Sequence, residues 1–188
     1  MTAPDAPPLD APAATVVPDA PPGALVARED GVGPLTEKSD ISVKALKAAF
    51  PDHEVKKVST PMGDGDLREE FVGVSKGGKL VLKVIGDGSL NGIEIVSNEV
   101  WNPFGVTIGM TYADAVKLVG PLACSDASDH TDWKSDIAEC ASTKSKFYGF
   151  DFALEGFEAK TLLKSPDKLA TAKLVALRWD SLGRVGEE

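Results

Sequence analysis

Apolar and polar residues alternate in short blocks along the chain, and glycine, proline and aspartate separate the blocks. Alternation with a period of two is typical of half-buried strands, and it occurs first at 55–60, 69–76, 79–85 and 92–97. The turns between these blocks contain Asp-Gly, Gly-Gly and Asn-Gly, which allow the positive φ of tight reversals. The pattern therefore predicts an antiparallel meander. Three further strands are predicted at 137–141, 146–154 and 172–180.

The helical period of 3.6 residues occurs in two segments. In the first, Ser39 and Asp40 are expected to cap a helix that runs to about Phe50. In the second, Thr111 and Asp114 have the spacing of a capping box, in which each side chain satisfies the other residue's free amide. This second helix is expected to run to about residue 119.

Each predicted helix ends at a proline and is followed by strands. Pro51 and Pro121 lie 70 residues apart, which favours two repeated helix-then-meander units whose strands join in one sheet. Coincidence is the alternative, because short helices commonly end at proline. Parallel crossovers would need a helix between most strands. The fold class expected is therefore α+β, a mostly antiparallel sheet with two helices on one face.

Residues 1–29 differ in composition from the rest of the chain. Seven of the 13 prolines lie in the first 24 residues, together with alanine and aspartate. Such a segment lacks the apolar mass that would offset the entropy of ordering. It is expected to be a disordered leader or tether, with a reach on the order of 70 Å when extended. A single α+β domain is then expected over 30–188.

The charge and the hydropathy exclude several classes of partner. A net charge of −9 and a pI near 4.8 disfavour nucleic acid, since binding phosphates needs clustered lysine and arginine. They also disfavour adsorption to an anionic bilayer. No apolar run approaches the ~20 residues of a membrane helix. No apolar signal-peptide core follows Met1, so either the protein is cytosolic or a removed leader preceded it.

The two cysteines favour export. Cys124 and Cys140 frame a short polar loop outside any CxxC pattern, which is typical of a structural disulfide. Such a bond would add about 3 kcal/mol of stability and would persist in an oxidising compartment. Two buried free thiols in a cytosolic protein are the alternative. A zinc site with His130 is disfavoured, because the spacing lacks a close chelating pair.

No pattern of catalytic, cofactor-binding or metal-binding residues is recognisable. The chain has no P-loop, no GxGxxG and no GxSxG, and the Asp-Gly stretch at 63–66 departs from a calcium loop. No cofactor is therefore expected. Trp101 and Phe104 flank Pro103 in a loop and are the candidate partner-contact patch, with simple packing as the alternative.

A family resemblance rests on four features. These are Gly31-Val32-Gly33-Pro34, the segment 105–111, the cysteine pair and the closing Arg178-Trp179. Together they resemble the RpoE-regulated lipoprotein family, the YfeY-like domains of unknown function, over about residues 30–182. The resemblance implies an α+β lipoprotein of the Gram-negative outer membrane, made under envelope stress. It supplies no activity and no catalytic residues, and the chain departs from it by starting at Met1 where a lipidated cysteine would stand.

The function expected is that of an exported envelope lipoprotein domain, a non-enzymatic binding or structural module. Its partner would be an unknown protein or cell-wall material, and it would meet the membrane only through a lipid anchor that this chain lacks. One alternative is an inhibitor-like periplasmic domain that binds proteins. Another is a hydrolase or metal-dependent enzyme that uses the 124–140 loop. The location expected is the periplasm or envelope, or the cytoplasm if Met1 is the natural start and the thiols are free.

Overall fold

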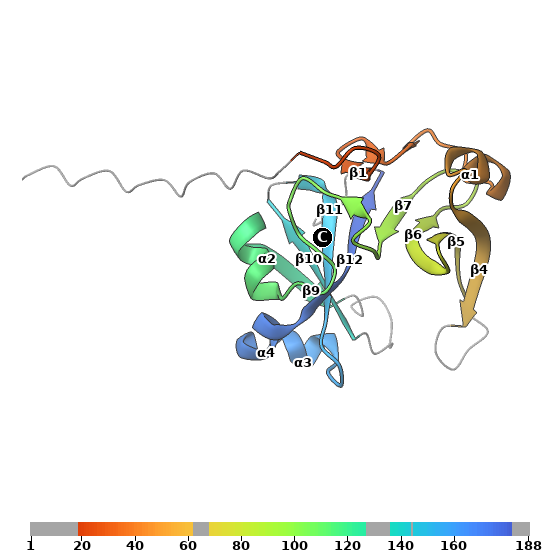
Figure 1. Ribbon diagram of the computed structural model, residues 1–188. Coiled ribbons are helices and arrows are strands. Elements are labelled where there is room, and N and C mark those ends of the chain that lie inside the picture. Colours follow the sequence, from red (N-terminus) through yellow and green to blue (C-terminus); the bar gives the residue numbers. More distant parts are fainter. Residues whose placement is uncertain (1–18, 62–67, 127–135, 144, 182–188) are drawn as a thin grey trace, which may run out of the picture.

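The computed structural model of the protein describes residues 19–61, 68–126, 136–143 and 145–181. Its main element is an eight-stranded sheet in which all neighbouring strands are antiparallel (Figure 1). In spatial order the strands are β4 (Glu54–Pro61), β5 (Arg68–Lys76), β6 (Lys79–Ile85), β7 (Gly92–Ile95), β12 (Lys173–Asp180), β11 (Ser145–Ala153), β10 (Ile137–Ser142) and β9 (Leu122–Asp126). Each half of the chain thus contributes four consecutive strands, and the last strands of the two halves, β7 and β12, pair in the middle.

A second, four-stranded sheet lies across one end of β11 and β12 (Figure 1). Its strands in spatial order are β3 (Leu35–Thr36), β2 (Gly31–Val32), β1 (Leu25–Arg28) and β8 (Val100–Trp101). Strand β1 lies inside the predicted leader of residues 1–29, so order begins earlier in the chain than the composition indicates. Its order comes from long-range pairing, because Leu25 lies beside Val100 in a parallel bridge.

The helices are short, and those described number four: α1 (Val43–Ala49), α2 (Tyr112–Val119), α3 (Ala159–Leu163) and α4 (Pro166–Thr171). The mostly antiparallel α+β class is confirmed, but only α1 and α2 were expected. Helices α3 and α4 have five and six residues, which is too short for a helical period to be visible. Helix α3 packs against β9 and β10, and α4 against α2. No helix in the described ranges has the length and apolarity to cross a membrane.

The Thr111 cap predicted for α2 is correct, although the Asp114 carboxylate accepts from the Thr111 hydroxyl rather than from its amide, and the cap predicted for α1 is wrong. The Thr111 hydroxyl oxygen accepts from the Asp114 amide at 3.1 Å, and the hydroxyl donates to the Asp114 carboxylate at 2.7 Å. Helix α1 begins later than expected, because Ser42 is its cap and accepts from the Ala45 amide at 3.2 Å. The carboxylate of Asp40 instead accepts from the backbone amide of Ser42, outside the helix.

The two faces of the large sheet differ in character. One face carries a continuous apolar row, because directly paired residues share a face. This row consists of Val74, Leu82, Ile95, Leu177, Phe150 and Cys140. The core lies between this face, helix α2 and the 102–106 loop, where Tyr112 and Phe104 contact aromatic rings of β11. The opposite face carries charged side chains.

Candidate functional site

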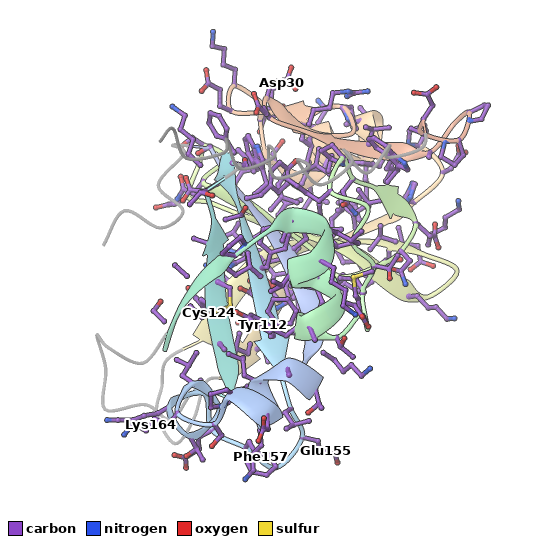
Figure 2. All side chains as sticks on the ribbon, turned by 90° about the vertical axis from the view of Figure 1, so that its left-hand side faces the viewer. Asp30, Tyr112, Cys124, Glu155, Phe157 and Lys164 are labelled. Carbon is purple, nitrogen blue, oxygen red and sulfur yellow. A yellow bond between two sulfur atoms is a disulfide. The ribbon has the colours of Figure 1, made fainter. Side chains whose placement is uncertain are left out.

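A groove of about 480 Å³ opens at the end of β11 and β12 that the small sheet covers. One wall is the turn between β1 and β2, the second is the segment that follows β3, and the floor comes from β11 and β12. The residues that line it are Glu29, Asp30, Thr36, Glu37, Lys38, Phe147, Trp179 and Ser181. Figure 2 shows Asp30 at one end of the molecule, with Glu155, Phe157 and Lys164 at the other.

Two buried aromatic side chains hold the β1–β2 turn in place. The indole Nε1 of Trp179 donates to the carbonyl oxygen of Glu29 at 3.1 Å. The hydroxyl of Tyr148 donates to the carbonyl oxygen of Arg28 at 2.7 Å. Both donor side chains are at most 2% exposed, so the core fixes the donor end of each bond, while the acceptor carbonyls belong to exposed residues of the turn. The wall of the groove is therefore fixed by the core of the large sheet.

Local backbone geometry shapes the same wall. Gly31 has a φ of 154°, and a Cβ at this position would collide with the backbone carbonyl of Leu35. Only glycine allows β2 and β3 to approach this closely. The Thr36 amide donates to the Ser39 hydroxyl oxygen at 2.9 Å, which fixes the second wall where it leaves β3.

The rim of the groove carries more negative than positive charge. Glu29, Asp30 and Glu37 are exposed carboxylates, and Lys38 is an exposed ammonium. Burial raises the pKa of the Tyr148 phenol well above its usual value, and the Asp30 carboxylate raises it further. The phenol therefore stays protonated and keeps its donor role.

Aromatic rings form the apolar part of the lining. Phe147 is half-buried on β11 and is the ring that a ligand can reach, whereas Trp179 is only 2% exposed and serves mainly to hold the wall. The ammonium of Lys146 lies 5.1 Å from the centroid of the Phe147 ring. The ring therefore already stands within range of a cation–π contact.

The sequence-predicted patch lies elsewhere. Trp101 is half-buried on β8, beside Val26 of β1. Phe104 packs edge-on against Tyr148 and Phe150, with centroids 5.2 and 5.5 Å apart, and so covers the core. The structure does not bring these two residues to the groove, and their role in partner contact stays a prediction.

The second concentration of charge lies on the opposite face of the sheet. Arg178 Nε donates to Asp151 at 2.8 Å, and its Nη2 lies 2.8 Å from Glu139. Burial raises the pKa of Asp151 to about 7; Arg178 lowers it, and the negative charge of Glu139 raises it further. Lys83 and Glu94 extend the row with an ion pair of 3.0 Å. The row joins strands β6, β7, β12, β11 and β10, so we interpret it as a brace of the sheet.

The predicted disulfide is present between Cys124 and Cys140, which are directly opposed on β9 and β10. Most of the loop that the bond closes, including His130, lies outside the described residues, so the enzyme alternative that uses this loop is not addressed. Within the described ranges, no three His, Cys, Asp or Glu side chains gather as metal ligands would.

Sequence reasoning missed the groove. Its walls come from 29–38 and its floor from 147–181, which only tertiary folding brings together. The available signal was the unusual Gly31-Val32-Gly33-Pro34 stretch, which marks a sharp reversal directly after two acidic residues.

Comparison with known proteins places the chain in a family. The sequence profile of the family "Protein of unknown function (DUF1131)" matches residues 22–181. The fold is similar to that of the uncharacterised protein YfeY from Escherichia coli, solved as a crystal structure, with a TM-score of 0.62. The two share 22% identity over 84% of this chain and 99% of that chain. No curated protein matches the chain. The expected YfeY-like resemblance is confirmed, and this chain belongs to the DUF1131 family of proteins of unknown function.

Proposed function

We propose that this protein is a non-enzymatic binding module of the bacterial cell envelope, and that the groove beside the Glu29–Asp30 turn is its ligand site. The observation that carries the proposal is the fixed wall of the groove. Trp179 and Tyr148 hold the turn by hydrogen bonds to the backbone of Glu29 and Arg28. A site formed before its ligand arrives avoids much of the entropic cost of ordering on binding.

The size and lining of the groove suit this role. Its volume of about 480 Å³ lies within the range of roughly 300–1,000 Å³ that is typical of ligand pockets. Aromatic rings with a few polar groups are the usual lining of such sites. The carboxylates at the rim are exposed to solvent, which favours recognition over general acid–base catalysis, where burial tunes the reacting groups.

The proposed location is the periplasmic side of the envelope, with a lipid anchor at the outer membrane. The disulfide between Cys124 and Cys140 supports it, because such bonds persist in oxidising compartments. The proline-rich composition of the first 24 residues suits a tether with a reach on the order of 70 Å. The partner would be another protein or cell-wall material.

The proposal extends to the architecture. We take the two halves as repeated units, each a helix followed by four strands of the large sheet, with α3 and α4 inserted between β11 and β12 in the second half. The strand order supports this. From the central β7–β12 pair, the strands of the first half follow towards one edge in the order β7, β6, β5, β4, and those of the second half follow towards the other edge in the order β12, β11, β10, β9. In this arrangement the charged brace centred on Arg178 joins the two units.

A variant that fills the groove tests the site. Thr36 is exposed and lines the groove, so Thr36→Trp should block it, while Thr161→Trp adds the same side chain to an exposed position on α3. Labelled, end-capped peptides of lysine, of acetyl-lysine and of glutamate serve as probes in fluorescence anisotropy. We expect at least one of them to bind the wild type and the Thr161 variant but not the Thr36 variant. If no probe distinguishes the two variants, the groove is not the ligand site.

Mass spectrometry tests the location. Protein purified from its native cells after alkylation of free thiols should carry the Cys124–Cys140 disulfide and a lipid at its amino terminus. A cytosolic, unlipidated protein with two alkylated cysteines would overturn the envelope part of the proposal.

A further inference from the structure

We infer that the groove binds the cationic side chains of a lysine- or arginine-rich segment of a partner protein. This inference rests on the proposed function and names the chemistry of the ligand. It joins three features of one place: a hollow of about 480 Å³, an excess of carboxylates at its rim and aromatic rings in its lining.

The rim supplies charge complementarity. Asp30 on the β1–β2 turn and Glu37 after β3 both line the groove, and the pairing of Gly31 with Thr36 sets these two segments side by side. Glu29 stands next to Asp30, so an ammonium or guanidinium in the groove would meet the field of three carboxylates. Lys38 is the single base among the lining residues, so the charge balance of the groove stays negative.

The aromatic lining suits the same ligand. Lysine and arginine carry an apolar stem that packs on rings while the charged end stays near water and carboxylates. The ammonium of Lys146, an exposed neighbour in the chain, lies 5.1 Å from the centroid of the Phe147 ring, so a ligand cation would share this ring with it or displace it. An anionic ligand would be repelled by the rim carboxylates.

The same charges argue against an occupant from the amino-terminal end of this chain. Residues 1–18 contain Asp5 and Asp10 but no lysine or arginine, so the rim would repel them. The carboxyl-terminal residues 182–188 contain one base, Arg184, and begin next to Ser181 of the groove. They are the rival occupant that the experiment has to distinguish.

The experiment measures the affinity of a labelled, end-capped oligolysine peptide at low ionic strength for matched variants of the full chain. Asp30→Asn with Glu37→Gln removes two rim charges. Glu155→Gln with Asp167→Asn removes two exposed charges at the opposite end, where Figure 2 places Glu155 and Figure 1 places α4. We expect the rim variant to bind about 5- to 10-fold more weakly and the control to stay within about 2-fold of the wild type.

Four results would overturn the inference. Equal loss in both double variants would mean attraction to the net charge of −9 alone. Unchanged affinity in both would place the peptide elsewhere. Equal binding of the acetyl-lysine peptide at the groove would show that the positive charge is irrelevant to binding. The proposed function would survive that result. The proposed function fails only if Thr36→Trp changes the binding of none of the probes. Tighter binding by Arg184→Gln, by about 5-fold or more, would make the chain's own carboxyl-terminal segment the occupant.

Discussion

The indole nitrogen of Trp179 donates a hydrogen bond to the carbonyl oxygen of Glu29 at 3.1 Å, although 150 positions separate the two residues. The bond joins the last strand of the large sheet to the first turn of the small one. Tyr148 repeats the arrangement one strand away, at Arg28. The core side chains Trp179 and Tyr148 therefore hold the groove wall directly. A substitution that weakens this contact should affect both the core and the wall.

Removal of one hydroxyl tests this coupling. Tyr148→Phe keeps the buried ring but leaves the carbonyl of Arg28 without its 2.7 Å donor. We expect the free energy of unfolding to fall by about 1–2 kcal/mol. Urea denaturation measures this loss, with Tyr112→Phe as the control, because that half-buried tyrosine contributes its ring contact to Phe152 and should change stability by less than about 0.5 kcal/mol. Equal losses in the two variants would contradict the role of the Tyr148 hydroxyl.

The glycine at the groove wall gives a second prediction. Gly31→Ala should destabilise the protein by more than about 2 kcal/mol, because its Cβ would collide with the backbone of Leu35 at a positive φ. Gly88→Ala is the matched control, since Gly88 has a positive φ but nothing within 4 Å of its Cβ position. That variant should lose only about 1 kcal/mol. Thermal or urea unfolding measures the two losses of stability. Equal losses in Gly31→Ala and Gly88→Ala would show that β2 and β3 can move apart freely.

The disulfide gives a third prediction. Cys124 and Cys140 lie 16 positions apart in the sequence, and a closed loop of this length is worth about 3 kcal/mol. Reductant should therefore lower the midpoint of urea unfolding of the wild type. A variant with both cysteines replaced by alanine should start at the lower midpoint and ignore reductant. A wild type that is insensitive to complete reduction would contradict a stabilising bond.

The charged brace gives a prediction about pH. Burial raises the pKa of Asp151 to about 7 from its ordinary 3.8, so the folded protein holds this proton more tightly than the unfolded chain. The contribution to stability is complete below about pH 4 and is lost as the pH rises through 7, by up to about 4 kcal/mol. Asp151→Asn should remove this dependence, which urea unfolding across the pH range measures.

Asp114→Asn is the control of opposite sign. The bonds from Lys117 and the Thr111 hydroxyl lower the pKa of this exposed carboxylate, so its contribution is present above its ordinary pKa and lost in acid. An Asp151 carboxyl that titrates near its ordinary value, as followed by carbon NMR, would contradict the account of the brace.

Local signals were enough to predict some elements correctly. Helix α2 begins and ends as expected, because Thr111 and Asp114 cap it within one turn and a glycine ends it at residue 120. Strands β5, β6 and β7 follow from alternation and from the glycine turns between them. In each case the forces that decide the structure act between residues close in sequence.

Other elements depend on distant partners. Strand β1 exists because Leu25 lies beside Val100, and nothing in the local sequence announces that pairing. Alternation places Arg178 on the side of its strand opposite Leu177 and Trp179, but its contact with Asp151 depends on the register of β11 and β12, which shifts next to Asp151. The groove likewise results from tertiary packing, so it could not be predicted, whereas the cysteine pair could.

The most direct test of the binding site uses the indole N–H signals of the protein's tryptophans in an NMR titration with the oligolysine peptide. Trp179 bonds to the groove wall, whereas Trp101 lies in the patch suggested by the sequence. We expect the Trp179 signal to move with peptide concentration and the Trp101 signal to stay in place. Movement of Trp101 with a stationary Trp179 would place the ligand at the Trp101–Phe104 loop and contradict the groove as the binding site.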